Sequence, residues 1–514
     1  MSADIRAFGD PHRHSAARWL AVVAGTIAVL AGLSVPFGYV PMLVVAFGLL
    51  IVAVILRPDF VTIGVAAVIY SNAASVAVHS HGVPVFLALL VPASLLIPFV
   101  FHLLVRRDQV RIPRATLFLL IFVLANTAAA AFAADPAVSA QPLFTLLTEG
   151  AAFYLIVVNV VRTPQMLRRV TWALVTTGAI LGGLSLLQQV TGTFSNDYGG
   201  FAQIKSTRGF TTETDALVGD IRQLRLAGPI GDSNYYAQFL LMLIPLGIGL
   251  ASSARDLFAR TMAVASVLLG ATGILLSFSR GAAVAFAILL FLMAATRFIR
   301  LRAIIAAAAV VVAVIVLFPQ YAVRLQRLEA VAAAVAGETA EGDTAIAGRA
   351  EENAAAIMIF ADHPILGAGP GMYQYHYRAY TTRAGLTTHA EDRLAHNMYL
   401  ETAAETGLVG LAALLGMLMV VLIGLRRAAR AVADTGVRPI IQAYFFALVA
   451  FMGTSVFLSL AYARYFWLVF ALASAAWMIS DEIRQPTPAG PRPARGGAPE
   501  TPRSAASGIG ASGP

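Results

Sequence analysis

The chain has 514 residues, of which 59% are hydrophobic and only 12% charged, whereas about a quarter of a soluble domain is charged, so most of the chain is expected to lie in lipid. The formal net charge is +9, but the basic residues lie mainly between apolar runs and form no basic face, which argues against a nucleic-acid partner. The chain contains no cysteine, which excludes thiolate catalysis, disulfides and cysteine metal sites.

Apolar runs follow one another along most of the chain, and a membrane-spanning helix needs about 20 mostly apolar residues. In chain order they lie at about 18–35, 37–56, 60–78, 84–104, 115–134, 142–161, 170–190, 233–251, 259–277, 281–296, 303–319, 398–424, 439–459 and 463–480. The sequence therefore predicts an all-α polytopic membrane protein with about 14 transmembrane helices. We expect the first run to be a membrane anchor rather than a cleaved signal peptide, because further spans follow at once.

Three segments divide the chain in this interpretation. Residues 1–17 form a cytoplasmic amino-terminal segment, and residues 18–484 form the membrane domain. The tail, residues 485–514, is rich in Pro, Gly, Ala and Ser and lacks periodic apolar residues, so we expect it to be disordered and cytoplasmic. No Walker motif or dinucleotide-binding glycine motif is present, which gives no support to ATP-driven transport.

The distribution of arginines predicts the orientation of the spans. With the amino terminus in the cytoplasm, most arginines fall in inside segments, and the short outside segments carry only Arg280 and Arg464. An even number of spans then places both termini in the cytoplasm. Two outside loops are long, at about 191–232 and 320–397. In the second, residues 330–341 are expected to be flexible, whereas the apolar stretch 354–360 predicts short helices that lie against the membrane or cap a cavity.

The outside segments collect polar residues that are unusual in so apolar a chain. Arg280 lies in SFSRGAAV, between two spans with almost no loop, so its guanidinium group must be held at the membrane surface or in a cavity. An arginine at that depth needs an anionic partner. It either snorkels to a lipid phosphate or binds the diphosphate of a lipid-linked substrate, whose oxygens match its planar fork.

Two further arginines on this side are candidates for the same role. Arg349 precedes an apolar helical run that ends at a proline and a glycine cluster, and it is either a solvated charge or a ligand of the substrate. Arg225 precedes a Gly and Pro break at the start of a span, and broken backbone beside a span usually lines a cavity. The alternative for this segment is a plain loop in which Asp232 or Ser233 caps the following helix.

The stretch HNMYLETAAETGLVG, residues 396–410, leads directly into a span. We expect the helix dipole to lower the pKa of His396, which would suit a general base, and we expect Asn397 to cap the helix or contact substrate. The alternative for the histidine is a plain polar helix end. Glu401 and Glu405 lie on the face of Asn397, and they either line the cavity or mark the membrane edge.

Over about residues 220–424 these motifs resemble the O-antigen ligase and O-antigen polymerase superfamily of bacterial surface-polysaccharide enzymes. Its members carry a His, then Asn, Ser or Gln, nine residues and Gly-x-x-Gly, which His396, Asn397, Gly407 and Gly410 match. SFSRG resembles the family's arginine at the end of a span. GRAEENAAAIMIFADHPILGAGPGMY resembles its Gly-Arg and Pro-x-x-Gly-x-Gly block, although the aromatic residue that commonly follows Gly-Arg is absent.

The resemblance implies a GT-C-like glycosyltransferase of the bacterial plasma (inner) membrane that serves the cell envelope. It would transfer a glycan from an undecaprenyl-diphosphate-type carrier to a glycan or glycolipid acceptor, as in lipopolysaccharide, on the extracytoplasmic face. No nucleotide sugar, cofactor or metal is implied. Its general base would be His396, and its diphosphate- and substrate-binding residues would be Arg280, Arg349, Arg225 and Asn397. The motifs do not separate a ligase from a polymerase.

Two other function classes remain as alternatives. A polysaccharide or lipid transporter should place charged residues near the membrane midplane, and the polar residues within the expected spans are few, among them Glu149, Asn126, Asn159 and Gln188. A metal-dependent transferase could use His389, Glu391, Asp392 and His396, but their spacing fits no established metal motif.

Overall fold

The computed structural model describes residues 58–205, 225–300, 344–386, 393–432, 436–459 and 463–484, together with Gly513. The predicted helices at about 18–35, 37–56 and 303–319, the flexible stretch 330–341 and almost all of the tail therefore lie outside the described residues. So do His389, Glu391 and Asp392 of the metal-dependent alternative.

The described chain is mainly helical, with two π-helical turns, η1 and η2. Its first half contains α3 (Pro58–Tyr70), α4 (Ala73–His81), α5 (Val85–Ala93), α6 (Leu96–Val100), η1 (Phe101–Val105), α7 (Ala115–Ala131), α8 (Pro136–Thr145), η2 (Leu146–Ala152), α9 (Phe153–Val160) and α10 (Pro164–Thr191). Its second half contains β1 (Gln203–Lys205), β2 (Arg225–Gly228), α11 (Ser233–Ser253), α12 (Leu257–Leu276), α13 (Arg280–Ala295), α16 (Thr344–Asp362), α17 (Met372–Arg383), α18 (Met398–Ala431), α19 (Arg438–Thr454) and α20 (Ala463–Arg484).

Every apolar run expected between residues 60 and 296 and between 398 and 480 corresponds to one of these helices or to a consecutive group of them. Among the described residues, seven helices are long and apolar enough to cross a membrane, and α3 with α4, bent by 56°, adds an eighth if the pair forms one span. The helices α7, α13 and α19 are apolar but shorter. An all-α polytopic membrane architecture is thus confirmed in outline, whereas the predicted number of 14 spans stays a prediction.

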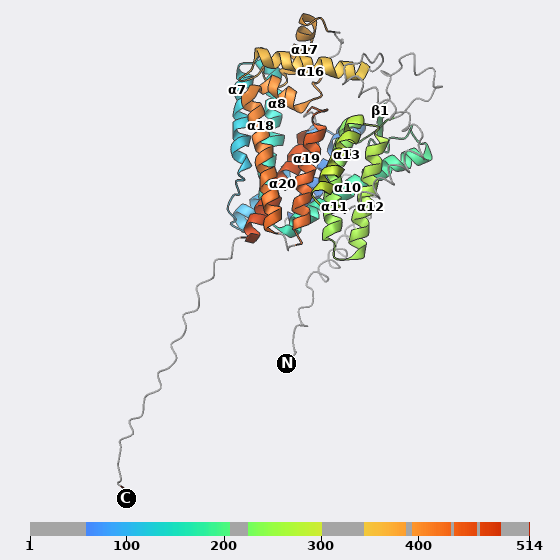
Figure 1. Ribbon diagram of the computed structural model, residues 1–514, viewed down its shortest axis with the longest axis vertical. Helices are drawn as coiled ribbons and strands as arrows, with labels where there is room; N and C mark the ends of the chain where they lie inside the picture. The colour runs from blue at the N-terminus through green and yellow to red at the C-terminus, as the bar shows by residue number, and fades with distance from the viewer. Residues whose placement is uncertain are drawn as a thin grey trace, which may run out of the picture.

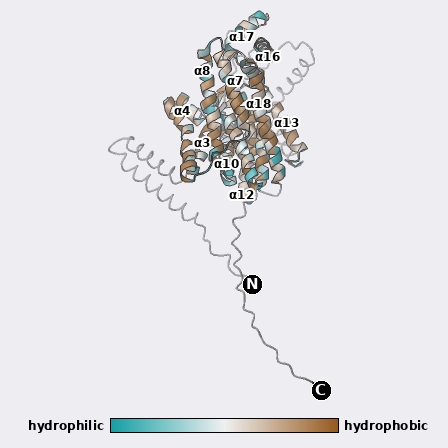
Figure 2. Ribbon diagram, turned by 90° about the vertical axis from the view of Figure 1, so that its left-hand side faces the viewer, coloured by the Kyte–Doolittle hydropathy of each residue, from teal (hydrophilic) through white to brown (hydrophobic). Residues whose placement is uncertain are grey.

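The interior of the bundle is built around α11 and α20. In each of these helices 78% of the residues in the apolar segment are buried, compared with 17% in the span Val85–Val105 at the periphery. The helix α11 packs against α12 and α19, and α18 packs against α7 (Figure 1). The hydropathy colouring shows apolar residues along most of the bundle (Figure 2). Two of the buried tyrosines in this interior are paired: the Tyr70 hydroxyl donates to the carbonyl of Phe239 at 2.8 Å, and the Tyr236 hydroxyl lies 2.9 Å from that of Ser185.

Two features at one end of the bundle shape the candidate site. The helix α16 lies across the ends of α7, α8 and α18, with α17 beyond it (Figure 1). This agrees with the short cap-like helices predicted around residues 354–360. The second feature is a short antiparallel hairpin of β1 and β2, in which Lys205 lies opposite Arg225.

Candidate functional site

The connection between α12 and α13 holds Arg280 where the sequence places it. Only Ser277, Phe278 and Ser279 separate the two helices, which confirms the expected near absence of a loop. Phe278 adopts a positive φ of 51°, and the hydroxyl of Ser279 accepts from the N–H of Ala282 at 3.4 Å as the cap of α13. Arg280 is thus the first residue of α13 and is half-buried at that helix end.

Arg225 links the hairpin to this connection. Its Nε donates to the carbonyl of Ser277 at 3.1 Å, and its Nη2 donates to Oδ1 of Asn234 on α11 at 2.9 Å. Asp232 caps α11 by accepting from the N–H groups of Asn234 and Tyr235, which confirms the cap expected at this position. Arg225 therefore fixes two segments that both border the pocket described next.

An open pocket, with about 230 Å³ of empty space including the part that faces solvent, brings the distant segments together. Its lining residues are Asn234, Ser279, Gly281, Ala282, Arg349, Thr454, Phe457 and Leu458. Arg349 comes from α16, inside the helix rather than before it as the sequence suggested. Because Ser279 and Gly281 flank Arg280, and Asn234 is bound by Arg225, the three predicted arginines gather around one pocket.

His396 lies next to the lining of this pocket, because it binds Ser459, the residue that follows Leu458, and it is held by three polar contacts. The backbone N–H of His396 donates to Oγ of Ser459 at 3.1 Å, and the ring nitrogen Nδ1 lies 3.0 Å from the carbonyl oxygen of Leu394. The third contact is to Oε2 of Glu352 on α16, also at 3.0 Å from Nδ1. The side chain of Glu352 is only 2% exposed, and its other oxygen, Oε1, accepts from Nη1 of Arg393 at 3.0 Å. A buried carboxylate thus orients the imidazole.

The expected direction of the His396 pKa shift is wrong. Burial opposes the charged imidazolium, but the hydrogen bond and negative charge of Glu352, together with the Leu394 carbonyl, raise the pKa above its ordinary value of 6.5. Arg349 is near enough for its charge to act in the opposite direction. His396 also precedes the cap residue of α18 rather than lying in its first turn, so the partner carboxylate outweighs the helix dipole.

Asn397 caps α18, as expected. Its Oδ1 accepts from the N–H groups of Tyr399 at 3.1 Å and Leu400 at 3.2 Å. The amide nitrogen Nδ2 is the part of this side chain that stays a candidate for substrate contact. The cap fixes the start of α18 directly after His396, so it also fixes the position of the imidazole.

The family-like glycines form an interlock between α16 and α18. Gly407 interrupts α18 with φ 64° and ψ −165°, which frees backbone groups on both sides of the break. The loop after α16 binds them: the N–H of Ala368 donates to Ala404 and the N–H of Leu408 donates to Pro364, at 2.9 and 2.8 Å.

Side chains could not be accommodated at this crossing. A Cβ on Gly367 would lie 2.2 Å from the carbonyl carbon of Glu405, and one on Gly407 would lie 2.2 Å from the carbonyl oxygen of Ile365. The carboxylate of Glu405 accepts from the N–H of Tyr373 at 3.3 Å, so this residue joins the interlock. The two glycines thereby set the helix of Arg349 and Glu352 against the histidine.

Sequence reasoning missed Glu352 as a site residue. It lies three residues after Arg349, and residues three apart share a helix face, so the pattern Arg-Ala-Glu-Glu could have indicated it. Its partners Arg393 and His396 lie more than 40 residues away in the chain, and no local pattern predicts that contact. Within the described ranges, no group of three or more His, Asp or Glu side chains is arranged to hold a metal ion.

Comparison with known families adds one finding. Residues 265–415 match a protein family described as O-antigen ligase. The match lies inside the range 220–424 in which the motifs suggested this resemblance, and it contains Arg280, Arg349, His396 and Asn397 but not Arg225. The resemblance is thereby confirmed, and it indicates a ligase- or polymerase-type function in polysaccharide assembly. No curated protein matches the chain.

Proposed function

From the O-antigen ligase family to which residues 265–415 belong, we propose that this chain transfers a glycan from a lipid diphosphate carrier to an acceptor hydroxyl. The observation that carries the proposal is the pairing of His396 with the buried Glu352 beside a pocket that Arg349 lines. A base and a phosphate-binding cation are the two groups that this reaction needs.

His396 is the proposed general base. When Nδ1 carries the proton and donates it to Glu352, Nε2 presents a lone pair, which accepts the proton of the acceptor hydroxyl. The acceptor oxygen then forms a bond to the anomeric carbon of the donor glycan, while the bond from that carbon to the diphosphate oxygen breaks. The electron pair of the broken bond leaves with the lipid diphosphate, and the imidazolium is stabilised by Glu352 until it releases its proton.

The arginines are the proposed partners of the leaving diphosphate. Arg349 lines the pocket, and Arg280 begins the helix whose first turn also lines it. Their planar guanidinium groups donate in pairs to phosphate oxygens and offset the charge that develops as the bond breaks. Arg225 supports this arrangement through Ser277 and Asn234, and Asn397 contributes its Nδ2 to substrate contact.

The proposal includes no metal or cofactor. A diphosphate is already a good leaving group, so cationic donors and a base meet the requirements of the reaction. We infer a donor of the undecaprenyl-diphosphate type, a glycan or glycolipid acceptor, and a site on the extracytoplasmic side of the bacterial inner membrane, with both termini in the cytoplasm. Full activity in the presence of a chelator would support metal independence, and activity restored only by added divalent ions would contradict it.

The lipid-linked glycans that accumulate in a strain lacking this chain test the proposal. A ligase predicts full-length polymer stranded on the diphosphate carrier, because chain growth continues while transfer to the final acceptor stops. Single repeat units on the carrier would instead indicate the polymerase of the same superfamily. An unchanged set of lipid-linked glycans would contradict both and would favour a different class.

A further inference from the structure

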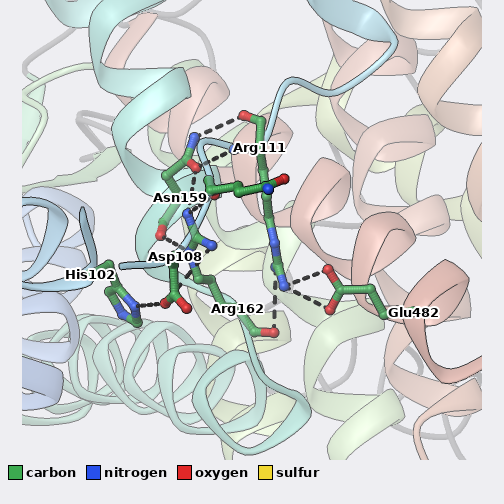
Figure 3. A network of polar contacts seen from close by, with 7 residues as sticks. His102, Asp108, Arg111, Asn159, Arg162 and Glu482 are labelled. Carbon is green, nitrogen blue, oxygen red and sulfur yellow. Dashed lines mark hydrogen bonds and ion pairs between the residues drawn. The ribbon is translucent and has the colours of Figure 1, made fainter. Parts of the chain in front are cut away.

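The connection from η1 to α7, residues 106–114, lies at the end of the bundle opposite to the candidate site. The helix α20 starts a few residues after Ser459, which binds His396, and its 22 residues extend about 33 Å. Near its far end, both carboxylate oxygens of Glu482 accept from Nη2 of Arg111, at 2.5 and 2.7 Å (Figure 3). The 106–114 loop is therefore anchored to the distant end of α20.

The backbone of this loop is fixed by Asn159, a fully buried residue of α9. Its Oδ1 accepts from the N–H of Arg111 at 2.7 Å, and its Nδ2 donates to the carbonyl of the same residue at 2.9 Å (Figure 3). Arg162 adds a bond from Nη2 to the carbonyl of Gln109 at 2.9 Å. The loop is thus held through its main chain, as a structural element and not as a loose connection.

Two carboxylates of the same network form ion pairs with two of the nearby arginines. Glu482 pairs with Arg111, while Asp108 accepts from Nδ1 of His102 at 2.8 Å and lies 3.9 Å from Nη1 of Arg162 (Figure 3). These two carboxylates offset the charges of Arg111 and Arg162. Asp108 is also near enough to Arg106 for the two charges to attract each other, and neither carboxylate pairs with Arg107 or Arg114.

Three arginines, Arg106, Arg107 and Arg114, are exposed, and none forms an ion pair with a carboxylate in the part of the chain that the structure describes. Two of them rest on rings: Arg106 lies 5.7 Å from the ring centre of Phe101, and Arg114 lies 5.9 Å from that of Trp477. Arg107 has a positive φ of 54°, which is uncommon for residues other than glycine. The loop therefore holds the guanidinium groups of Arg106 and Arg114 against rings and leaves Arg107 exposed beside them.

Apolar side chains project between these cations. In the stretch 110–113, Arg111 points inward and Pro113 is buried, whereas Val110 and Ile112 are 52% and 70% exposed. Such alternation is typical of an extended segment with one outward face. Exposed aliphatic side chains beside arginines are typical of a segment that lies at the interface between lipid headgroups and acyl chains.

We propose that the 106–114 loop is a binding site for an anionic phospholipid of the adjacent leaflet. Arg106, Arg107 and Arg114 contact the headgroup phosphate, because the guanidinium fork donates to phosphate oxygens in pairs. Val110 and Ile112 contact the start of the acyl chains. The charge of the site and its apolar neighbours together select a lipid over free phosphate, since inorganic phosphate offers nothing for the aliphatic side chains to contact.

Lipid retention by the full-length chain tests this site. The protein is purified in a neutral detergent, titrated with phosphatidylglycerol or phosphatidylcholine, and the bound lipid is counted by native mass spectrometry. The test variant carries Arg106→Gln, Arg107→Gln and Arg114→Gln. The matched control removes three exposed arginines from the same end of the bundle, Arg426, Arg427 and Arg430 on α18. A second test variant, Val110→Ser with Ile112→Ser, keeps every charge.

We expect the wild type to retain phosphatidylglycerol in preference to phosphatidylcholine, and excess inorganic phosphate not to displace it. The arginine variant should bind phosphatidylglycerol about 10-fold to 100-fold more weakly, from the usual contribution of a basic residue near an anionic surface. The α18 control should lose less than about 3-fold, and the Val110 and Ile112 variant should also bind more weakly. Equal losses in the loop and control variants would show general electrostatic attraction and overturn the proposal. Displacement by phosphate would overturn it as well.

Discussion

Glu352→Gln separates the proposed base from a plain polar helix end. The substitution keeps the size of the side chain but removes the negative charge that contacts Nδ1 of His396 at 3.0 Å. Glutamine either accepts from Nδ1 through its oxygen or donates to Nδ1 through its nitrogen. In the second arrangement the neutral imidazole carries its proton on Nε2, where the proposed mechanism needs a lone pair.

The size of the effect follows from the contact. A hydrogen bond to a charged partner contributes about 1.5–3 kcal/mol, and each 1.36 kcal/mol in the activation barrier changes a rate tenfold. If the imidazolium that forms during transfer loses this contact, the transfer rate should fall about 10-fold to 100-fold. Glu352 is 2% exposed, so water does not replace the lost partner.

The pH dependence of the rate should change as well. A base acts in its neutral form, so wild-type activity should rise with pH through the raised pKa of His396, above 6.5. Without the charge of Glu352, burial and Arg349 still lower the pKa of His396, and only the Leu394 carbonyl still raises it. The acid limb of the variant should therefore move to lower pH than in the wild type, although its plateau is lower.

The assay is the initial rate of glycan transfer by the purified protein in lipid nanodiscs between pH 5 and 9. Asp362→Asn is the matched control, because it makes the same chemical change on an exposed carboxylate at the end of α16 and should leave the rate and the profile unchanged. A Glu352→Gln variant with a wild-type rate and a wild-type acid limb would refute the base assignment.

Three further predictions use the same protein. Arg280→Lys should lose most of its transfer activity although the charge is kept, because paired phosphate contact needs the guanidinium fork; near wild-type rates would favour snorkelling to lipid. Gly407→Ala should destabilise the chain by several kcal/mol in thermal unfolding, because the new Cβ would lie 2.2 Å from backbone and the φ and ψ of this residue suit only glycine. Gly453→Ala is the control and should not destabilise the chain, because no atom lies within 4 Å of its Cβ. Equal unfolding temperatures for the two variants would contradict the interlock. Since the chain has no cysteine, Asp362→Cys should be labelled only from outside and Arg426→Cys only from the cytoplasm, and the reverse would overturn the orientation.

Among the described residues, hydropathy was sufficient to predict the long apolar helices, because in lipid an apolar run of span length has few alternatives to a helix. It could not predict breaks and bends within them. The interruption at Gly407 and the 56° bend between α3 and α4 both lie inside predicted apolar runs. Each is accompanied by a contact with a distant segment, because the N–H of Leu408 donates to the carbonyl of Pro364 and Nδ2 of Asn72 donates to that of Pro229. The position of α16 across the ends of other helices agrees with its own sequence, because its mixture of apolar and charged residues suits neither a membrane span nor an exposed loop.

In the site, residues governed by local geometry were predictable. Arg280 follows from two spans with almost no loop, and Asn397 and Asp232 follow from the preference of helix caps. Contacts between distant segments were not. Glu352 reaches His396 across 44 residues, and this contact reverses the pKa shift expected from the helix dipole alone.

The most direct test of the account is transfer by a reconstituted His396→Ala variant. Purified wild-type protein, given an undecaprenyl-diphosphate-linked oligosaccharide and a glycolipid acceptor, should release the lipid diphosphate and extend the acceptor by the mass of the glycan. His396→Ala should insert normally and bind the donor as well as the wild type, yet transfer about 100-fold to 10,000-fold more slowly, the usual contribution of a general base. A variant that binds the donor and transfers at the wild-type rate would contradict the central claim.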